Sequence, residues 1–155
     1  GIMSGASSRV LTERTVMAMP EIAIGLFPDV GGTYFLNRLP AGVGLFLGLT
    51  GARVSSHDAA SLGLADGIVR SEKRGEIFAG LSRLSWSPDP QKNKQTLRDY
   101  LASVVEPDLA NRGDLLKRLD IVKQLTLKAT VEEIDSGFRS WHGNDNGSRV
   151  VFTVT

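Results

Sequence analysis

The sequence predicts a mixed α/β fold, with short strands and helices in residues 1–70 and a mainly helical region in residues 71–155. Before residue 70, β-prone and apolar runs alternate with turn-forming residues. After it, apolar residues recur at the spacing of amphipathic helices. The 155 residues, of which 41% are hydrophobic, are enough to form one compact domain.

Two short strands are predicted first. Residues 10–12 and 16–19 are β-prone or apolar, and they lie on either side of the polar residues 13–15. Pro20 ends the second run, because proline has no N–H for a sheet ladder. Residues 21–32 contain a proline and paired glycines, which predicts loop and turn.

Three short helices and a strand follow. The helices are predicted over residues 33–39, 43–49 and 56–62, and the strand over residues 65–70. Pro40 and Gly51 end the first two helices. A Ser-His-Asp start suits N-capping of the third, and Gly63 suits the position just after its end.

The second half is predicted to be helical. Apolar residues at helical spacing predict helices over residues 73–84, 91–101 and 115–127, and a capping box at residues 130–133 opens another helix to about residue 138. Residues 86–90 are a predicted loop. Residues 143–148 are turn-like and residues 149–155 are β-prone.

Composition excludes several classes of protein. Eighteen Lys and Arg against seventeen Asp and Glu leave a net charge of +1, without the basic excess of nucleic-acid-binding proteins. No apolar run is long enough for a membrane-spanning helix. The absence of cysteine excludes disulfides and thiolate chemistry in these residues, and two histidines, His57 and His142, argue against a histidine-rich metal site.

Two acids bracket the most unusual stretch of the sequence. Glu21 and Asp29 flank an otherwise apolar segment that contains proline and glycine. A carboxylate in such surroundings is a candidate general base or nucleophile, and two on one loop are predicted to face one cavity. The alternative is structural: Glu21 ends a strand in solvent, and Asp29 caps the helix that starts near Gly31.

Ser56, His57 and Asp58 have the residue types of a catalytic triad. They are neighbours at a helix start, whereas a triad needs convergence in space, so a capping role is predicted. Trp86 and Trp141 are predicted to be packing residues.

A basic cluster lies in the predicted helix over residues 91–101. Lys92, Lys94 and Arg98 have the charge to meet a phosphate. Charged helix faces are usually solvated, and we predict a solvated face here.

The segment over residues 18–32, Ala-Met-Pro-Glu-Ile-Ala-Ile-Gly-Leu-Phe-Pro-Asp-Val-Gly-Gly, resembles the crotonase (enoyl-CoA hydratase/isomerase) superfamily. The resemblance is closest to the 3-hydroxyisobutyryl-CoA hydrolase branch. It continues through residues 33–40, 44–53, 58–60 and 63–66, is strong over residues 1–69 and is weaker to about residue 138. It implies a partial crotonase-like ββα spiral in residues 1–70, followed by a helical C-terminal region in residues 71–155 whose tail, residues 140–155, departs from the family pattern.

The resemblance implies roles for both acids. In the family, the glutamate of the Pro-Glu pair acts at the bound thioester, which places this role on Glu21. In the hydrolase branch an aspartate eight residues later belongs to the site, which corresponds to Asp29. Glu21 is then expected to attack the thioester carbonyl, through a glutamyl anhydride, or to activate a water. Asp29 is expected to hold the 3-hydroxyl group or to assist proton transfer.

The same resemblance separates hydrolysis from hydration. Hydratases have a second catalytic glutamate twenty positions before the first, and dienoyl-CoA isomerases have another acid there; this position is Gly1. Acyl-CoA thioester hydrolysis, with 3-hydroxyisobutyryl-CoA of valine catabolism as substrate, is the leading hypothesis. The alternatives are an enoyl-CoA hydratase or isomerase, and a non-catalytic binding or assembly module.

Further expectations follow from the family. The two backbone donors of its oxyanion hole map before residue 1, so the 155 residues alone are expected to be inactive. No metal or redox cofactor is implied, since CoA is part of the substrate. The expected partners are acyl-CoA and copies of the same chain, in trimers or hexamers, with neither nucleic acid nor membrane. The expected compartment is the cytoplasm for a bacterial protein or the mitochondrial matrix for a eukaryotic one.

Overall fold

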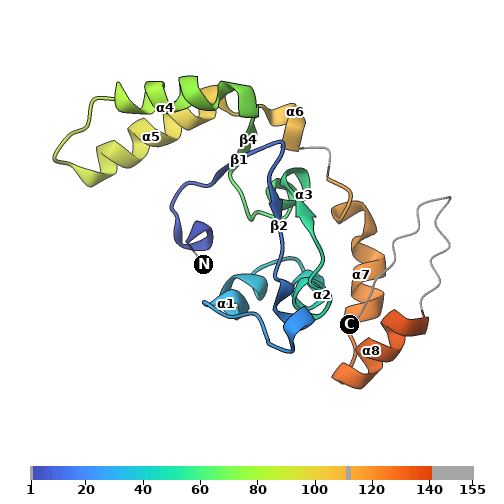
Figure 1. Cartoon of the computed structure of the whole chain (residues 1–155). Helices are drawn as coiled ribbons and strands as arrows, with labels where there is room; N and C mark the ends of the chain where they lie inside the picture. The colour runs from blue at the N-terminus through green and yellow to red at the C-terminus, as the bar shows by residue number, and fades with distance from the viewer. Residues whose placement is uncertain (1, 111–112, 141–155) are drawn as a thin grey trace. The chain divides into compact units, whose positions relative to one another are not determined.

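The computed structural model describes residues 2–110 and 113–140 (Figure 1), which form two compact units. The first unit contains Met17–Val54 and the described part of Leu115–Thr155, and the second contains Ile2–Val16 and Ser55–Asp114. The chain passes between the units within β2 (Val16–Met17) and within β3 (Val54–Ser55). The mixed α/β class is confirmed. The division into domains 1–70 and 71–155 stays a prediction, and the predicted elements after residue 140 lie outside the described residues.

A short parallel sheet forms the centre of the second unit. β1 (Val10–Thr12) pairs with β4 (Gly67–Val69), with Leu11 opposite Ile68. Both of these side chains are buried, and Ile68 is fully enclosed. The prediction of strands at residues 10–12 and 65–70 is therefore confirmed, although the second is shorter than predicted.

The second unit also contains six helices in its described residues, and one of them precedes β1. They are η1 (Met3–Gly5), α3 (Ser56–Ser61), η3 (Ser71–Lys73), α4 (Arg74–Ser82), α5 (Pro90–Val104) and α6 (Pro107–Ala110). Figure 1 shows α4 and α5 running side by side, and the Tyr100 hydroxyl of α5 donates a hydrogen bond of 2.9 Å to the Ile77 carbonyl of α4. The sequence missed α6, which is too short for a periodic pattern.

The first unit is built around α2 (Val43–Thr50). It packs against η2 (Pro20–Ile24), α1 (Gly32–Leu36) and α7 (Leu119–Thr126), and α7 packs in turn against α8 (Val131–Ser140). A short helix, η4 (Leu116–Arg118), precedes α7. The core includes Phe46 and Phe138, whose ring centroids lie 6.2 Å apart. No helix in the described ranges is long and apolar enough to span a membrane.

Local signals fixed several helix ends as predicted. Gly63, just after α3, has a φ of 74°, as the expected C-terminal glycine requires. The backbone N–H of Glu133 donates to the Thr130 hydroxyl at 3.2 Å, and Glu133 Oε2 accepts from the backbone N–H of Ala129 at 3.0 Å. The predicted capping box is therefore present, except that the glutamate carboxylate accepts from the N–H of Ala129, the residue before the threonine, and not from the threonine itself.

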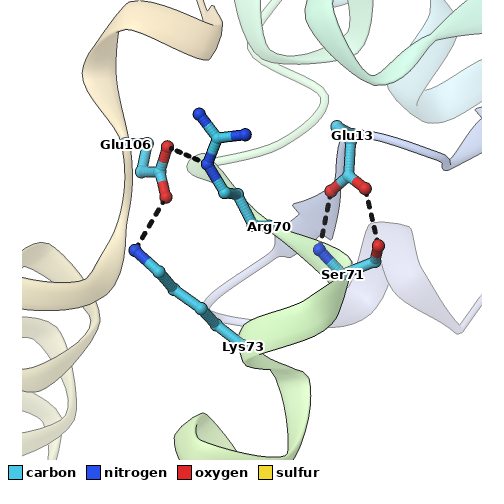
Figure 2. A network of polar contacts seen from close by, with 5 residues as sticks. All are labelled: Glu13, Arg70, Ser71, Lys73 and Glu106. Carbon is cyan, nitrogen blue, oxygen red and sulfur yellow. Dashed lines mark hydrogen bonds and ion pairs between the residues drawn. The ribbon is translucent and has the colours of Figure 1, made fainter.

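A polar network stabilises the segment after β4 (Figure 2). Glu13 accepts hydrogen bonds from the backbone N–H of Ser71 at 2.7 Å and from its hydroxyl at 2.6 Å. Glu106 forms ion pairs of 3.0 Å with both Arg70 and Lys73. The Ser71 hydrogen bonds lower the pKa of Glu13 below its usual value, and Lys73 and Arg70 do the same for the pKa of Glu106.

We expect Glu13→Gln to weaken the dependence of the free energy of unfolding on pH in the acidic range. Because the folded-state pKa of Glu13 is lowered, its stabilisation is complete above the unfolded-state pKa and is lost as the pH falls through the folded-state value. Urea unfolding between about pH 3 and pH 7 measures this. The wild type should lose stability more steeply below about pH 4.5 than Glu13→Gln. Glu76→Gln, at an exposed site on α4, is the control and should keep the wild-type slope.

Candidate active site

Glu21 lies on a tight helical turn rather than in the predicted loop. Residues Pro20–Ile24 form η2, with proline at its first position and Gly25, at a φ of 75°, after its last. Proline is preorganised for the first helical position, and a left-handed glycine ends a helix readily. The prediction that residues 21–32 are all loop and turn is therefore wrong for this part.

The turn rests on the end of α2. A Cβ atom placed on Gly51 would lie 3.4 Å from the Cα of Pro20 and 3.4 Å from Ile22 Cγ2. Gly51 itself has a φ of 62° and ends α2. The close approach of a glycine thus holds the backbone on both sides of Glu21 against a helix.

The Glu21 side chain is half-buried, and its Oε2 atom is enclosed. This oxygen has no hydrogen-bond partner among the described residues. Leaving a buried polar atom unpaired costs about 1–3 kcal/mol, so such an atom calls for an explanation. The alternative in which Glu21 ends a strand in solvent is wrong, because the residue is helical and partly enclosed.

Asp29 lies on an exposed turn at the start of α1. Its carbonyl accepts a hydrogen bond of 2.6 Å from the N–H of Gly32. The N-cap of α1 is Gly31, and no side chain caps this helix. The structural alternative for Asp29, that its carboxylate caps the helix, is therefore wrong.

Both acids belong to the first unit, and α2 supports both turns. A Cβ atom on Gly48 would lie 3.3 Å from Cγ of Pro28, the residue before Asp29. In the same way, a Cβ atom on Gly51 would contact the turn that carries Glu21. One helix therefore fixes the two backbone segments that carry the acids. That the two carboxylates share one cavity stays a prediction.

Large apolar side chains are exposed around these turns. Their exposed fractions range from 52% to 76%, and they are Ile24, Leu26, Phe27, Val30 and Tyr34. In the sequence, the only sign of this exposure is that these apolar residues lie between or beside glycines and prolines. An apolar surface beside a carboxylate suits a ligand that has an apolar part and a group that donates a hydrogen bond.

The Ser-His-Asp segment has the predicted capping role, shifted by one residue. Ser55 is the N-cap of α3 and accepts from the backbone N–H of Asp58 at 3.1 Å, while its hydroxyl donates to Asp58 Oδ2 at 2.7 Å. Ser56 is buried, and its hydroxyl donates to the Glu13 carbonyl at 3.3 Å. The His57 side chain takes no part in these hydrogen bonds of Ser55, Ser56 and Asp58.

The predictions for the basic cluster and for the tryptophans have different outcomes. Lys92, Lys94 and Arg98 are exposed on α5, as predicted for a solvated face. Trp86 is 54% exposed, so its prediction as a packing residue is wrong, and Trp141 lies outside the described residues. Within residues 2–110 and 113–140, no group of three or more His, Asp or Glu side chains is placed to hold a metal ion.

Comparison with proteins of known sequence identifies relatives of the chain. It is 40% identical over 136 residues to 3-hydroxyisobutyryl-CoA hydrolase 1 of Arabidopsis thaliana, which covers 88% of this chain and 35% of that protein. It is 41% identical over 129 residues to the mitochondrial 3-hydroxyisobutyryl-CoA hydrolase of Xenopus laevis, covering 81% of this chain and 32% of the relative. The chain thus spans about a third of the length of these relatives.

Solved structures give the same fold. A carnitinyl-CoA dehydratase from Mycobacterium thermoresistibile superposes with a TM-score of 0.74 at 31% identity, over 92% of this chain and 38% of that one. An enoyl-CoA hydratase from Rhodobacter sphaeroides gives 0.68 at 31% identity, over 91% and 36%. The prediction of a partial crotonase-like fold is confirmed. The family profile described as enoyl-CoA hydratase/isomerase matches residues 1–151, and the chain therefore belongs to the enoyl-CoA hydratase/isomerase family.

Proposed function

We propose that the protein carrying this chain is an acyl-CoA thioester hydrolase that acts on 3-hydroxyisobutyryl-CoA. The observation that carries the proposal is the enclosed, unpartnered Oε2 atom of Glu21. Because no described residue bonds to this oxygen, the Glu21 carboxylate has no structural partner there, and its half-buried side chain is available to a bound ligand. The relatives named as 3-hydroxyisobutyryl-CoA hydrolases, at about 40% identity, support the choice of substrate.

In the proposed reaction, a Glu21 oxygen attacks the thioester carbonyl carbon. The carbon–sulfur bond breaks, CoA leaves as its thiolate, and an acyl–glutamyl anhydride remains. Water then hydrolyses the anhydride, which releases the carboxylic acid and restores the Glu21 carboxylate. In the alternative, Glu21 takes a proton from a water that attacks the same carbon, and no covalent intermediate forms.

Asp29 is proposed to hold the 3-hydroxyl group of the acyl chain. A carboxylate accepts a hydrogen bond from a hydroxyl, and the Asp29 side chain is exposed and caps no helix. The exposed apolar residues beside it, Phe27 and Val30, suit the hydrocarbon part of the acyl group.

A hydratase or isomerase is the second candidate, because the superposed solved structures include an enoyl-CoA hydratase and a carnitinyl-CoA dehydratase. Glycine at position 1 argues against it, since the family's second glutamate is expected there. The complete protein that carries this chain should release thiol from 3-hydroxyisobutyryl-CoA, measured with a thiol-reactive dye. Loss of crotonyl-CoA absorbance without thiol release would identify a hydratase instead. Neither activity, together with a stable oligomer, would favour an assembly module.

We expect Asp29→Asn to lower kcat/KM for 3-hydroxyisobutyryl-CoA by about 10- to 100-fold, the usual worth of one hydrogen bond to a charged group. Hydrolysis of isobutyryl-CoA, which lacks the hydroxyl, should change much less. Steady-state thiol release with both substrates measures the ratio. Asp120→Asn, at an exposed site on α7 of the same unit, is the control. An equal loss on both substrates would contradict the hydroxyl-binding role.

A further inference from the structure

Val30 has a backbone conformation that valine rarely adopts. Its φ is 41°, and it is the only residue other than glycine with a positive φ in the part of the chain that the structure describes. A left-handed conformation brings Cβ too close to the following carbonyl oxygen, and a β-branched residue there is a true outlier. The backbone at Val30 is therefore strained.

The strain lies in the turn that presents Asp29. The Asp29 carbonyl accepts from the Gly32 N–H at 2.6 Å, and the two residues between them, Val30 and Gly31, have φ values of 41° and 77°. Two consecutive positive φ values are typical of a type I′ turn, in which glycine, asparagine and aspartate dominate. Valine is the unexpected residue in this turn.

Burial does not offset the strain within the described residues. The Val30 side chain is 70% exposed, so it contributes little to the core. Strained residues persist only where their surroundings determine them, and they concentrate at functional sites. The strained conformation of Val30 therefore needs a reason other than packing.

What valine adds to the turn is stiffness. Its branched Cβ restricts the backbone to a narrow range, whereas glycine at the same position reaches many more conformations. The Asp29 side chain does not cap α1 and is exposed, so the backbone of the turn sets the direction of the Cα–Cβ bond from which its carboxylate projects. We propose that Val30 is a positioning residue whose strained, stiff backbone fixes the Asp29 carboxylate for the 3-hydroxyl group of the substrate.

The proposal rests on the proposed function, and Val30→Gly tests it. Glycine relieves the left-handed strain but loosens the turn, so the melting temperature should stay the same or rise by a few degrees. The value of kcat/KM for 3-hydroxyisobutyryl-CoA should fall about 10-fold, because small displacements of a positioned group are costly. The value for isobutyryl-CoA should change by less than about 3-fold, since that substrate has no hydroxyl for Asp29 to hold. If Val30 had only a structural role, a variant that is equally stable or more stable would not lose kcat/KM for the hydroxylated substrate.

Val30→Thr is the conservative control. Threonine keeps the branched Cβ and the stiffness, so it should retain the wild-type preference for the hydroxylated substrate within about 2-fold. Unchanged kcat/KM in Val30→Gly would overturn the proposal, and so would a marked fall in its melting temperature, because no strain would then have been relieved.

The same measurements separate this proposal from the proposed function. If the wild type releases no thiol, or if Asp29→Asn leaves the substrate preference unchanged, the proposed function fails and the role of Val30 fails with it. If Asp29→Asn removes the preference and Val30→Gly does not, the proposed function stands and only the role of Val30 is wrong.

Discussion

Replacing Glu21 by glutamine is expected to lower thiol release by about 10²–10⁴-fold, the range that one general acid or base contributes. The amide has nearly the same shape but neither accepts a proton at neutral pH nor attacks a carbonyl. Stability should change little, because the substitution leaves the fold of η2 unaltered and removes a carboxylate whose enclosed oxygen has no partner among the described residues. Steady-state kinetics together with thermal unfolding measure both effects.

The matched control is Glu132→Gln, an exposed glutamate on α8 in the same unit. It should leave turnover unchanged. Wild-type turnover in Glu21→Gln would show that the catalytic role lies elsewhere, and a large loss of stability would show that Glu21 is a structural residue.

Isotope labelling separates the two proposed roles of Glu21. In the anhydride route, water that attacks the glutamyl carbonyl leaves its oxygen in the side chain of Glu21. Turnover in water enriched in heavy oxygen should then add mass to the peptide that contains residue 21. Base catalysis places the label only in the acid product, as does an anhydride that water attacks at its acyl carbonyl, so label in the peptide identifies the anhydride route.

The second large effect is expected in the scaffold, at Gly44 of α2. A Cβ atom there would lie 2.7 Å from the carbonyl carbon of Leu36 and still closer to its oxygen. Because the obstacle is backbone at the end of α1, no side-chain rotation relieves the contact. We expect Gly44→Ala to lower the free energy of unfolding by roughly 1–3 kcal/mol, as overpacking does. Chemical denaturation monitored by circular dichroism measures the change.

Gly137→Ala is the matched control, in α8 of the same unit. The nearest atoms to a Cβ on Gly137 lie at 3.8 Å, an ordinary contact. Alanine should therefore stabilise this helix by about 0.5–1 kcal/mol, from propensity alone. Opposite signs at the two glycines are the expected result. Equal stabilisation at both would show that α1 does not need its close approach to α2.

The Gly44 substitution should also lower activity. α1 begins at Gly32, directly after the turn that carries Asp29, so a displaced α1 moves this turn. The loss should resemble that of Asp29→Asn, with the hydroxylated substrate affected more than isobutyryl-CoA. The substrate comparison made for Asp29→Asn measures this effect.

Local sequence determined many of the elements. The β-prone run at residues 10–12 forms β1, helical spacing predicted α4, α5 and α7, and Gly63 takes the left-handed conformation after α3. These features depend on neighbours in the chain, which periodicity and capping rules describe well. The family resemblance was also confirmed, because the family profile matches the residues on which it rested.

Where contacts between distant residues decided the structure, the sequence patterns were insufficient. Pro28 and the glycines at positions 31 and 32 predict loop and turn for residues 21–32, yet η2 forms because Pro20 and Gly25 bound a short helix that packs on α2. Trp86 is typical of a core residue by its type, but its side chain is 54% exposed. Ser55 caps α3 in place of Ser56, because Ser56 turns inward to the Glu13 carbonyl.

The sequence by itself determined that the chain is a mixed α/β member of the enoyl-CoA hydratase/isomerase family, and it singled out Glu21 and Asp29 as the acids to examine. Only the tertiary structure decided that one oxygen of Glu21 is enclosed without a described partner, that Asp29 caps no helix, and that Val30 is strained. Periodicity and motifs report which residues are near one another along the chain. The enclosure of the Glu21 oxygen depends on residues that only the folded unit brings together, and the φ of Val30 is fixed only in the folded turn, so neighbours in the sequence do not reveal either.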